Sequence, residues 1–331
     1  MKIAFVWNPD LWVNRCHYVM EVFVHMLEEK SVTVLSVGDL DGVYPSSFDV
    51  VILESTSISI ERYCFPRDLV DSYNAFIRNA KRLVMYVHDI HDSTWIDGIS
   101  GFSRFIKQNG IQTLITKCER NQEFELLAEM LSDHEFVHML DVHSLPLDFQ
   151  APVRDRSDKL FDIFMFGNFQ PWQGYVFRKR VHDLVLKLPA KVFHQEVGGS
   201  FSRDQFSNVL LGKDLIRLIS HSYLTLCTRT TYDYFVLKYV EAAAAGTVIL
   251  GDIPSDAKNL LSSDNFVHID ESMSDELIAS TISESLKSKE DLYMRGQALR
   301  RRFSRKFSME KHVDDIVSFI ERTDGDFGAL Q

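Results

Sequence analysis

Short, continuously apolar runs recur along this chain, each about the length of a β-strand and each followed by a longer amphipathic segment. Apolar runs without polar alternation are typical of strands that are covered on both faces, as in a parallel sheet between helices. In the first half of the chain we expect strands at 3–7, 32–37, 48–53, 83–88, 111–116 and 136–140. We expect the intervening helices at 14–29, 67–79, 102–108 and from residue 119 onwards.

The same rhythm restarts after a polar stretch at 146–159, which contains two prolines and predicts a linker. Strands are expected at 160–166, 191–194, 223–227, 247–250 and 266–269, with helices at 175–188, 204–220 and 234–245. Only helical pattern follows from 274 to 322. A chain of 331 residues has room for about two domains. The sequence therefore predicts an α/β protein with two Rossmann-like, doubly wound domains.

Charge and composition exclude several classes of protein. Lys and Arg number 36 against 47 Asp and Glu, and the net charge of -11 disfavours nucleic acid as a partner. The four cysteines form no C-x-x-C pair that would indicate a zinc or redox site. No apolar run approaches the roughly 18 to 20 residues of a membrane span, and the start of the chain is not typical of a signal peptide. We expect a cytoplasmic protein.

The densest signal for chemistry is the segment 228–252. A loop rich in hydroxyl groups leads into a predicted helix, which ends in four alanines and a Gly246 suited to a helix C-cap, and a strand follows. A helix N-terminus favours phosphate, because its N–H groups are unpaired. Asp233 and Glu241 are eight residues apart, which on one helix would be about 12 Å of rise. That spacing suits two carboxylates that address opposite ends of a nucleotide-sugar.

This segment resembles the retaining GT-B glycosyltransferases of the group-1, or family 4, superfamily, and in particular its CgeB-like branch. Glu241-Ala-Ala-Ala-Ala-Gly246-Thr-Val-Ile is similar to the second half of the family's E-x7-E motif, and Asp233 replaces the first Glu. The strand and turn that end in Gly167 and Asn168, followed by Arg178-Lys179-Arg180, resemble the start of the family's donor-binding domain. In the first half, His88-Asp89 resembles the family's strand-end His-Asp pair.

The resemblance implies two domains that face each other across a cleft: an acceptor-side domain at 1–150 and a nucleotide-sugar-binding domain at 151–307. It also implies a closing helix at 308–324 that returns to the first domain. The implied catalytic residues are His88 and Asp233. The implied donor-binding residues are Gly167, Asn168, Arg178, Thr230, Thr231, Lys238 and Glu241, and the implied acceptor-side residues are Asn8, Trp12 and Asp89.

The expected reaction is transfer of a hexose from a nucleoside diphosphate sugar to a glycan, lipid or other acceptor, with retention. The sequence contains no G-x-G-x-x-G, no P-loop and no D-x-D at a metal-site position, so we expect neither cofactor nor metal. The alternatives are a catalytically silent GT-B-like domain that binds a glycan or protein, and an inverting GT-B enzyme or epimerase. A basic cluster at Arg300–Lys306 indicates a solvated helix face, or else a contact with an anionic surface.

Overall fold

The computed structural model describes residues 1–9, 18–55, 67–87, 98–116, 122–138, 144–169, 175–196, 210–229, 233, 235–257 and 261–326. The chain divides into two compact units. Unit 1 comprises residues 1–142 together with 309–331, and unit 2 comprises residues 143–308. No helix among the described residues is long and apolar enough to cross a membrane.

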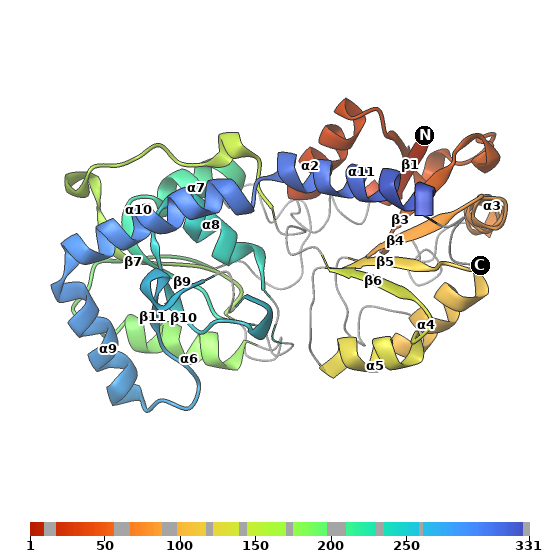
Figure 1. Cartoon of the computed structure of the whole chain (residues 1–331). Coiled ribbons are helices and arrows are strands. Elements are labelled where there is room, and N and C mark those ends of the chain that lie inside the picture. Colours follow the sequence, from red (N-terminus) through yellow and green to blue (C-terminus); the bar gives the residue numbers. More distant parts are fainter. Residues whose placement is uncertain are drawn as a thin grey trace. The chain divides into compact units, whose positions relative to one another are not determined.

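Unit 1 is built on a sheet whose six described strands are all parallel (Figure 1). Their order across the sheet is β2-β1-β3-β4-β5-β6. The strands are β1 (Ile3–Trp7), β2 (Thr33–Ser36), β3 (Val50–Glu54), β4 (Leu83–Val87), β5 (Thr113–Thr116) and β6 (Glu135–His138). The strand pattern predicted from continuous apolar runs is confirmed, with boundaries that differ by at most two residues.

Helices cover both faces of this sheet because successive strand residues point to opposite sides. On one face Phe5 and Tyr86 pack against α2 (Tyr18–Glu29) and α11 (Met309–Asp326). On the other face Val6 and Met85 pack against α3 (Arg67–Arg78), α4 (Gly98–Gln108) and α5 (Gln122–Met130). The last helix of the chain therefore belongs to the core of unit 1, where it contacts α2.

Unit 2 contains a second parallel sheet, of five described strands in the order β11-β10-β9-β7-β8. The strands are β7 (Phe161–Gly167), β8 (Val192–Glu196), β9 (Ser222–Leu226), β10 (Val248–Gly251) and β11 (Phe266–His268). One face packs against α6 (Val176–Val185) and α9 (Asp275–Lys287). The strands also contact α7 (Gly212–Ile219), α8 (Leu237–Ala245) and α10 (Lys289–Lys306), and α8 packs against both α7 and α10.

Two helix predictions in unit 2 were wrong at their amino ends. Of the helix expected at 204–220, residues 204–209 lie outside the described residues, and α7 begins at Gly212, after Leu211 in an extended conformation. The helix expected at 234–245 begins at Leu237, so Asp233 lies in the preceding loop and not on the helix. Tertiary packing explains why α8 starts late. The buried Phe235 ring stacks on Phe307, the residue directly after α10, with ring centroids 5.7 Å apart, and Val236 is extended.

Candidate functional site

The polar side chains of unit 2 gather where its central strands end. Because β7, β9 and β10 are parallel, their carboxyl ends at Gly167, Leu226 and Gly251 lie at the same edge of the sheet. Helix α8 begins at Leu237 after the loop that follows β9, and it ends at Gly246, which adopts a left-handed conformation with φ 71°. The prediction of a glycine C-cap is thus confirmed. The edge of a parallel sheet at its strands' carboxyl ends is the usual ligand site of such folds.

Lys238 on α8 reaches the end of β7. Its amine donates a hydrogen bond to the carbonyl of Phe166 and lies 4.3 Å from the centre of the Phe166 ring. Gly167 has a φ of +98°, and a Cβ at that position would approach the Lys238 Cε to 2.7 Å. The positive φ favours glycine here, and a side chain at this position would also displace the flexible end of Lys238. Burial, together with the nearby Arg178, holds the pKa of Lys238 well below its usual value.

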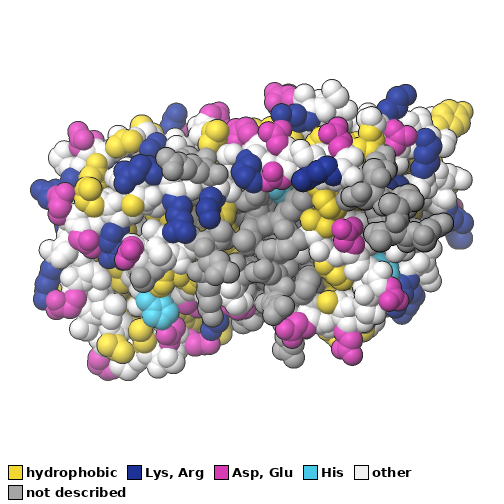
Figure 2. Space-filling view, in the orientation of Figure 1, with side chains coloured by type: hydrophobic (Ala, Val, Ile, Leu, Met, Phe, Trp, Pro, Cys, Tyr) yellow, Lys and Arg dark blue, Asp and Glu magenta, His cyan; other side chains and the backbone are white. Residues whose placement is uncertain are grey.

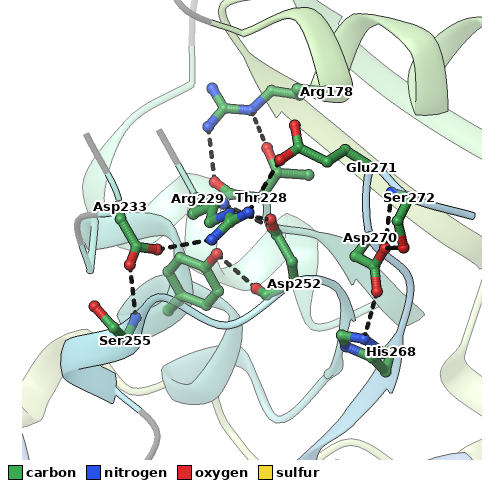
Figure 3. A network of polar contacts seen from close by, with 11 residues as sticks. Arg178, Thr228, Arg229, Asp233, Asp252, Ser255, His268, Asp270, Glu271 and Ser272 are labelled. Carbon is green, nitrogen blue, oxygen red and sulfur yellow. Dashed lines mark hydrogen bonds and ion pairs between the residues drawn. The ribbon is translucent and has the colours of Figure 1, made fainter. Parts of the chain in front are cut away.

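Arg178 on α6 is buried and joins the ends of two strands. Its Nε donates to the Thr228 hydroxyl at 3.0 Å, and one Nη donates to the Thr228 carbonyl at 3.1 Å (Figure 3). The other Nη donates to the Asn168 carbonyl at 3.3 Å. The guanidinium carbon also lies 4.0 Å from the centre of the Tyr175 ring. These contacts fix the backbone after β7 and β9, and burial lowers the pKa of Arg178.

Asp233 is held from two sides. One carboxylate oxygen pairs with Arg229 at 3.2 Å, and the other accepts a hydrogen bond from the Ser255 backbone N–H at 3.3 Å (Figure 3). Its φ of +57° places it in the left-handed region, which non-glycine residues rarely adopt. The expected 12 Å rise from Asp233 to Glu241 along one helix is wrong, because the helix starts four residues later.

Arg229 is the centre of this network. Besides Asp233 it pairs with Asp252 at 2.9 Å and with Glu271 at 3.2 Å, and its backbone N–H donates to Asp252 at 2.8 Å. Asp252 is buried directly after β10, and this burial raises its pKa. Sequence reasoning assigned no role to Arg229 or Asp252. Charged residues directly after two predicted neighbouring strands were the signal that could have found them.

Glu241 lies one helical turn after Lys238 on α8 and is buried, with 4% of its surface exposed. Its negative charge acts against burial to raise the pKa of Lys238. Below both residues lies Cys227, whose pKa burial raises to about 12, so that its thiol stays protonated. Lys238 and Glu241 thus lie one turn apart on α8, and the charge of Glu241 favours the protonated form of Lys238.

The remaining cations of the predicted donor side have protein partners. Lys179 pairs with Asp183, and Arg180 pairs with Asp275 and donates to the carbonyls of Glu271 and Met273. In the C-terminal basic cluster, both nitrogens of the Arg300 fork donate to the Ala151 carbonyl, at 3.1 and 2.6 Å. Arg300 therefore fixes the chain near the start of unit 2.

The predicted residues of unit 1 are only partly described. Asn8 is buried directly after β1, and its Nδ2 has no hydrogen-bond partner among the described residues. The predicted residues His88, Asp89, Trp12, Thr230 and Thr231 lie outside the described residues. Of the predicted donor-side residues, the structure brings Gly167, Asn168, Arg178, Lys238 and Glu241 to one edge of the unit 2 sheet.

Across the ranges that the structure describes, no group of three or more His, Cys, Asp or Glu side chains could hold a metal ion. The groups at this edge of unit 2 include the cations Arg178, Lys238 and Arg229, the buried carboxylates Glu241 and Asp252, and the glycine turn at Gly167. Cations and backbone N–H groups beside a glycine turn are suited to a phosphate or diphosphate.

The fold defines a class: two parallel α/β sheets of this topology are the GT-B fold of glycosyltransferases. HepE from Anabaena, in complex with UDP-glucose, is 14% identical, with 96% of this chain and 99% of that chain covered at a TM-score of 0.60. Sucrose-phosphate synthase from Thermosynechococcus elongatus is 10% identical, with 98% and 99% covered and a TM-score of 0.67. T4 phage BGT with its UDP-glucose substrate is 14% identical, with 95% and 99% covered and a TM-score of 0.56.

Sequence comparisons give no such likeness: no family model matches the chain, and no curated protein matches it. Similarity to the solved structures extends over nearly the whole length of each chain, at identities of 10 to 14%. At that level the comparison establishes the fold, and activity has to be argued from the site.

Proposed function

We propose that this chain is a glycosyltransferase that moves a hexose from a nucleoside diphosphate sugar to a glycan, lipid or other acceptor. The observation that carries the proposal is the position of the Lys238 amine at the Gly167 turn, at the carboxyl edge of the unit 2 sheet. A cation and a glycine turn at this edge can hold a diphosphate close to the backbone. The proposed donor-binding unit is therefore unit 2.

Glu241 supports the nucleotide part of the proposal. Glu241 is a buried carboxylate on a helix of small residues, one turn after Lys238, and a carboxylate can accept hydrogen bonds from the two hydroxyls of a ribose. Lys238 would bind the diphosphate, and Glu241, one helical turn further along α8, would bind the ribose. UDP is the first nucleotide to test, because HepE and T4 phage BGT were both solved with UDP-glucose.

The proposed mechanism is electrostatic. As the bond from the sugar to the diphosphate breaks, negative charge grows on the departing phosphate oxygens, and the Lys238 ammonium would stabilise it. The sugar becomes oxocarbenium-like, and a carboxylate nearby would stabilise its positive charge. Asp233 is the proposed carboxylate, with His88 as the proposed polar contact of the sugar. We propose retention and no requirement for a metal, following the resemblance to family 4 and its CgeB-like branch.

A specific observation favours the second candidate function, a catalytically silent GT-B-like domain. Both oxygens of Asp233 already bind protein groups, the guanidinium of Arg229 and the N–H of Ser255. In this reading the carboxylate fixes the loop before α8 and takes no part in catalysis. Such a domain would bind a glycan or a protein and would turn over no donor.

The deciding experiment separates binding from turnover. Purified protein is titrated with UDP, GDP and CDP by calorimetry, and hydrolysis of UDP-glucose is followed by release of UDP. Binding with slow hydrolysis that survives EDTA supports a metal-independent transferase, whereas binding without hydrolysis or transfer supports the silent domain. The anomeric form of the product distinguishes retention from inversion. Absence of nucleotide binding contradicts the transferase and leaves a silent domain that binds a glycan or a protein.

A further inference from the structure

A cavity of about 440 Å³ opens in unit 1 at the amino edge of its sheet, where β4 and β5 begin. It lies between the C-terminal ends of α3 and α4, and we call it the basic pocket after the cations that line it: Arg78, Lys81 and Arg82. Ligands of open α/β sheets usually bind at the carboxyl ends of the strands. This pocket is therefore distinct from the site proposed in unit 2.

The charged residues that line the basic pocket are positive, whereas the protein as a whole carries a negative net charge. Three cations occur within five residues, and none of the described residues that line the pocket is acidic, although the chain carries a net charge of -11. A concave surface lined by one sign of charge concentrates the opposite charge. The expected ligand is therefore an anion.

Capping of helix ends accounts for only part of this charge. Arg78 Nε donates to the Asn74 carbonyl at 3.1 Å, and Asn79 and Asn109 donate to the carbonyls of Ala75 and Phe105. These bonds satisfy the carbonyl groups at the ends of α3 and α4. Among the described residues Arg78 uses its Nε alone for this bond, so its two terminal nitrogens can turn towards a ligand.

Lys81 is also available to an anion. It pairs with Asp49 at 3.2 Å, but both side chains are about half exposed, at 53% and 42%. Exposed pairs of this kind contribute little to stability, so a doubly charged ligand can replace Asp49 as the partner of Lys81. Two cations from the end of α3 can then bind one phosphate group.

The rest of the lining indicates what carries the anion. The lining includes the amides of Gln108, Asn109 and Gln112 and the apolar side chains of Ile77 and Leu83. The hydroxyl of Thr113, also in the lining, donates to Glu135 at 3.0 Å. A Cβ added at Gly110 would meet no atom within 4 Å, so the space in front of that turn is open. Amides suit hydroxyl groups, and a volume of about 440 Å³ lies within the range of small-molecule pockets.

We infer that the basic pocket is a second ligand site, which binds a phosphate group carried on a polyhydroxylated molecule of about the size of one sugar. The phosphate contacts Arg78 and Lys81, and the hydroxyl groups contact the amides of Gln108, Asn109 and Gln112. This site does not depend on the donor site proposed in unit 2, because its residues lie wholly in unit 1.

The test uses glucose 6-phosphate as the probe, with glucose and inorganic phosphate as partial probes. Calorimetry measures affinity, and hydrogen exchange of peptides covering 77–83 and 108–113 locates the binding. We expect glucose 6-phosphate to bind more tightly than either partial probe and to protect both peptides. We expect the doubly substituted Arg78→Gln/Lys81→Gln protein to bind at least tenfold more weakly, because charge-assisted hydrogen bonds are lost.

The control replaces two exposed, paired cations of unit 2, as Arg217→Gln/Lys287→Gln, which makes the same change in net charge. It should bind glucose 6-phosphate as the unchanged protein does. Equal binding by the Arg78/Lys81 variant, or protection only of peptides outside the basic pocket, would overturn the inference. Binding of inorganic phosphate as tight as that of glucose 6-phosphate would overturn the part that assigns the hydroxyl groups to the amides.

Discussion

The amine of Lys238 lies in the space where residue 167 would carry a side chain, and it binds the Phe166 carbonyl directly before that glycine. Two residues 71 positions apart therefore depend on each other: the lysine can reach the end of β7 only because the turn there is a glycine. This relation fixes a cation at the proposed diphosphate position and leads to the first two predictions.

Gly167→Ala should both destabilise unit 2 and weaken nucleotide binding. A non-glycine residue at φ +98° costs about 1 to 3 kcal/mol, and the new Cβ would also displace Lys238. Gly42→Ala is the matched control, because Gly42 has φ +75° but open space where its Cβ would be. Urea unfolding and UDP titration should show a larger loss for the Gly167 variant. If both variants lost the same stability and the Gly167 variant kept its UDP affinity, the position of Lys238 would not depend on Gly167.

Lys238→Met should weaken UDP binding by about 1.5 to 3 kcal/mol, the contribution of a hydrogen bond to a charged group. Lys179→Met, which removes a cation paired with Asp183 on nearby α6, should leave the affinity nearly unchanged. Calorimetry of the two variants provides the comparison. A Lys238 variant that binds UDP normally would remove the observation on which the proposed function rests.

The UDP affinity should also depend on pH in a way that Lys238 explains. Its pKa is lowered in the free protein, mainly by burial, and only the protonated amine attracts the diphosphate. The affinity should therefore fall as pH rises through this lowered pKa, at a pH below the 10.5 of an ordinary lysine. Titrations across alkaline pH should show this fall in the unchanged protein and a flatter profile in Lys238→Met.

Glu241→Gln should weaken UDP binding, also by about 1.5 to 3 kcal/mol, if the carboxylate accepts hydrogen bonds from the ribose hydroxyls. Removing those hydroxyls tests the same contact from the ligand's side. 2′,3′-Dideoxy-UDP should bind the unchanged protein more weakly than UDP does, and the variant should hardly distinguish the two ligands. If the affinity losses from the Glu241 substitution and from removal of the ribose hydroxyls were additive, Glu241 would not contact those hydroxyls.

Asp233→Asn should lower kcat more than it weakens UDP binding, if the carboxylate stabilises charge on the sugar in the transition state. Glu271→Gln provides the control, because it removes another carboxylate partner of Arg229 and leaves Asp233 in place. Steady-state rates with UDP-glucose would separate the two roles. Similar small effects in both variants would make Asp233 an anchor of the loop before α8.

His312 should make unit 1 less stable in acid. Its Nε2 lies 3.1 Å from the Tyr86 hydroxyl, and burial lowers the pKa of its imidazole to about 3 from 6.5. Between these two pKa values His312 is protonated in the unfolded chain but neutral in the folded chain. The free energy of unfolding should therefore fall as pH drops from about 6.5 towards 3. Tyr86→Phe/His312→Leu should show a shallower fall in urea unfolding. His25→Leu, at an exposed position, should keep the original profile.

Local sequence determined most elements of the fold. Continuous apolar runs predicted the parallel strands, because a strand buried on both faces has no polar positions, and Gly246 predicted the end of α8. The resemblance in the segment 228–252 predicted GT-B, and the fold confirms it. These features depend on residues close together in the chain, so a pattern in the sequence can reveal them.

Contacts between distant residues were decided only by the tertiary structure. Phe235 stacks on Phe307 and keeps the chain extended before α8, which overrides the helical pattern from residue 234. Arg229 acquires Asp252 and Glu271 as partners because parallel strands bring their carboxyl ends to one edge. In the sequence, the resemblance implied Lys238 as a donor-binding residue, but nothing indicated that it lies at Gly167. Its position at Gly167 follows from the packing of α8 against the sheet, since the energy of that contact depends on where the two segments meet and on neither segment alone.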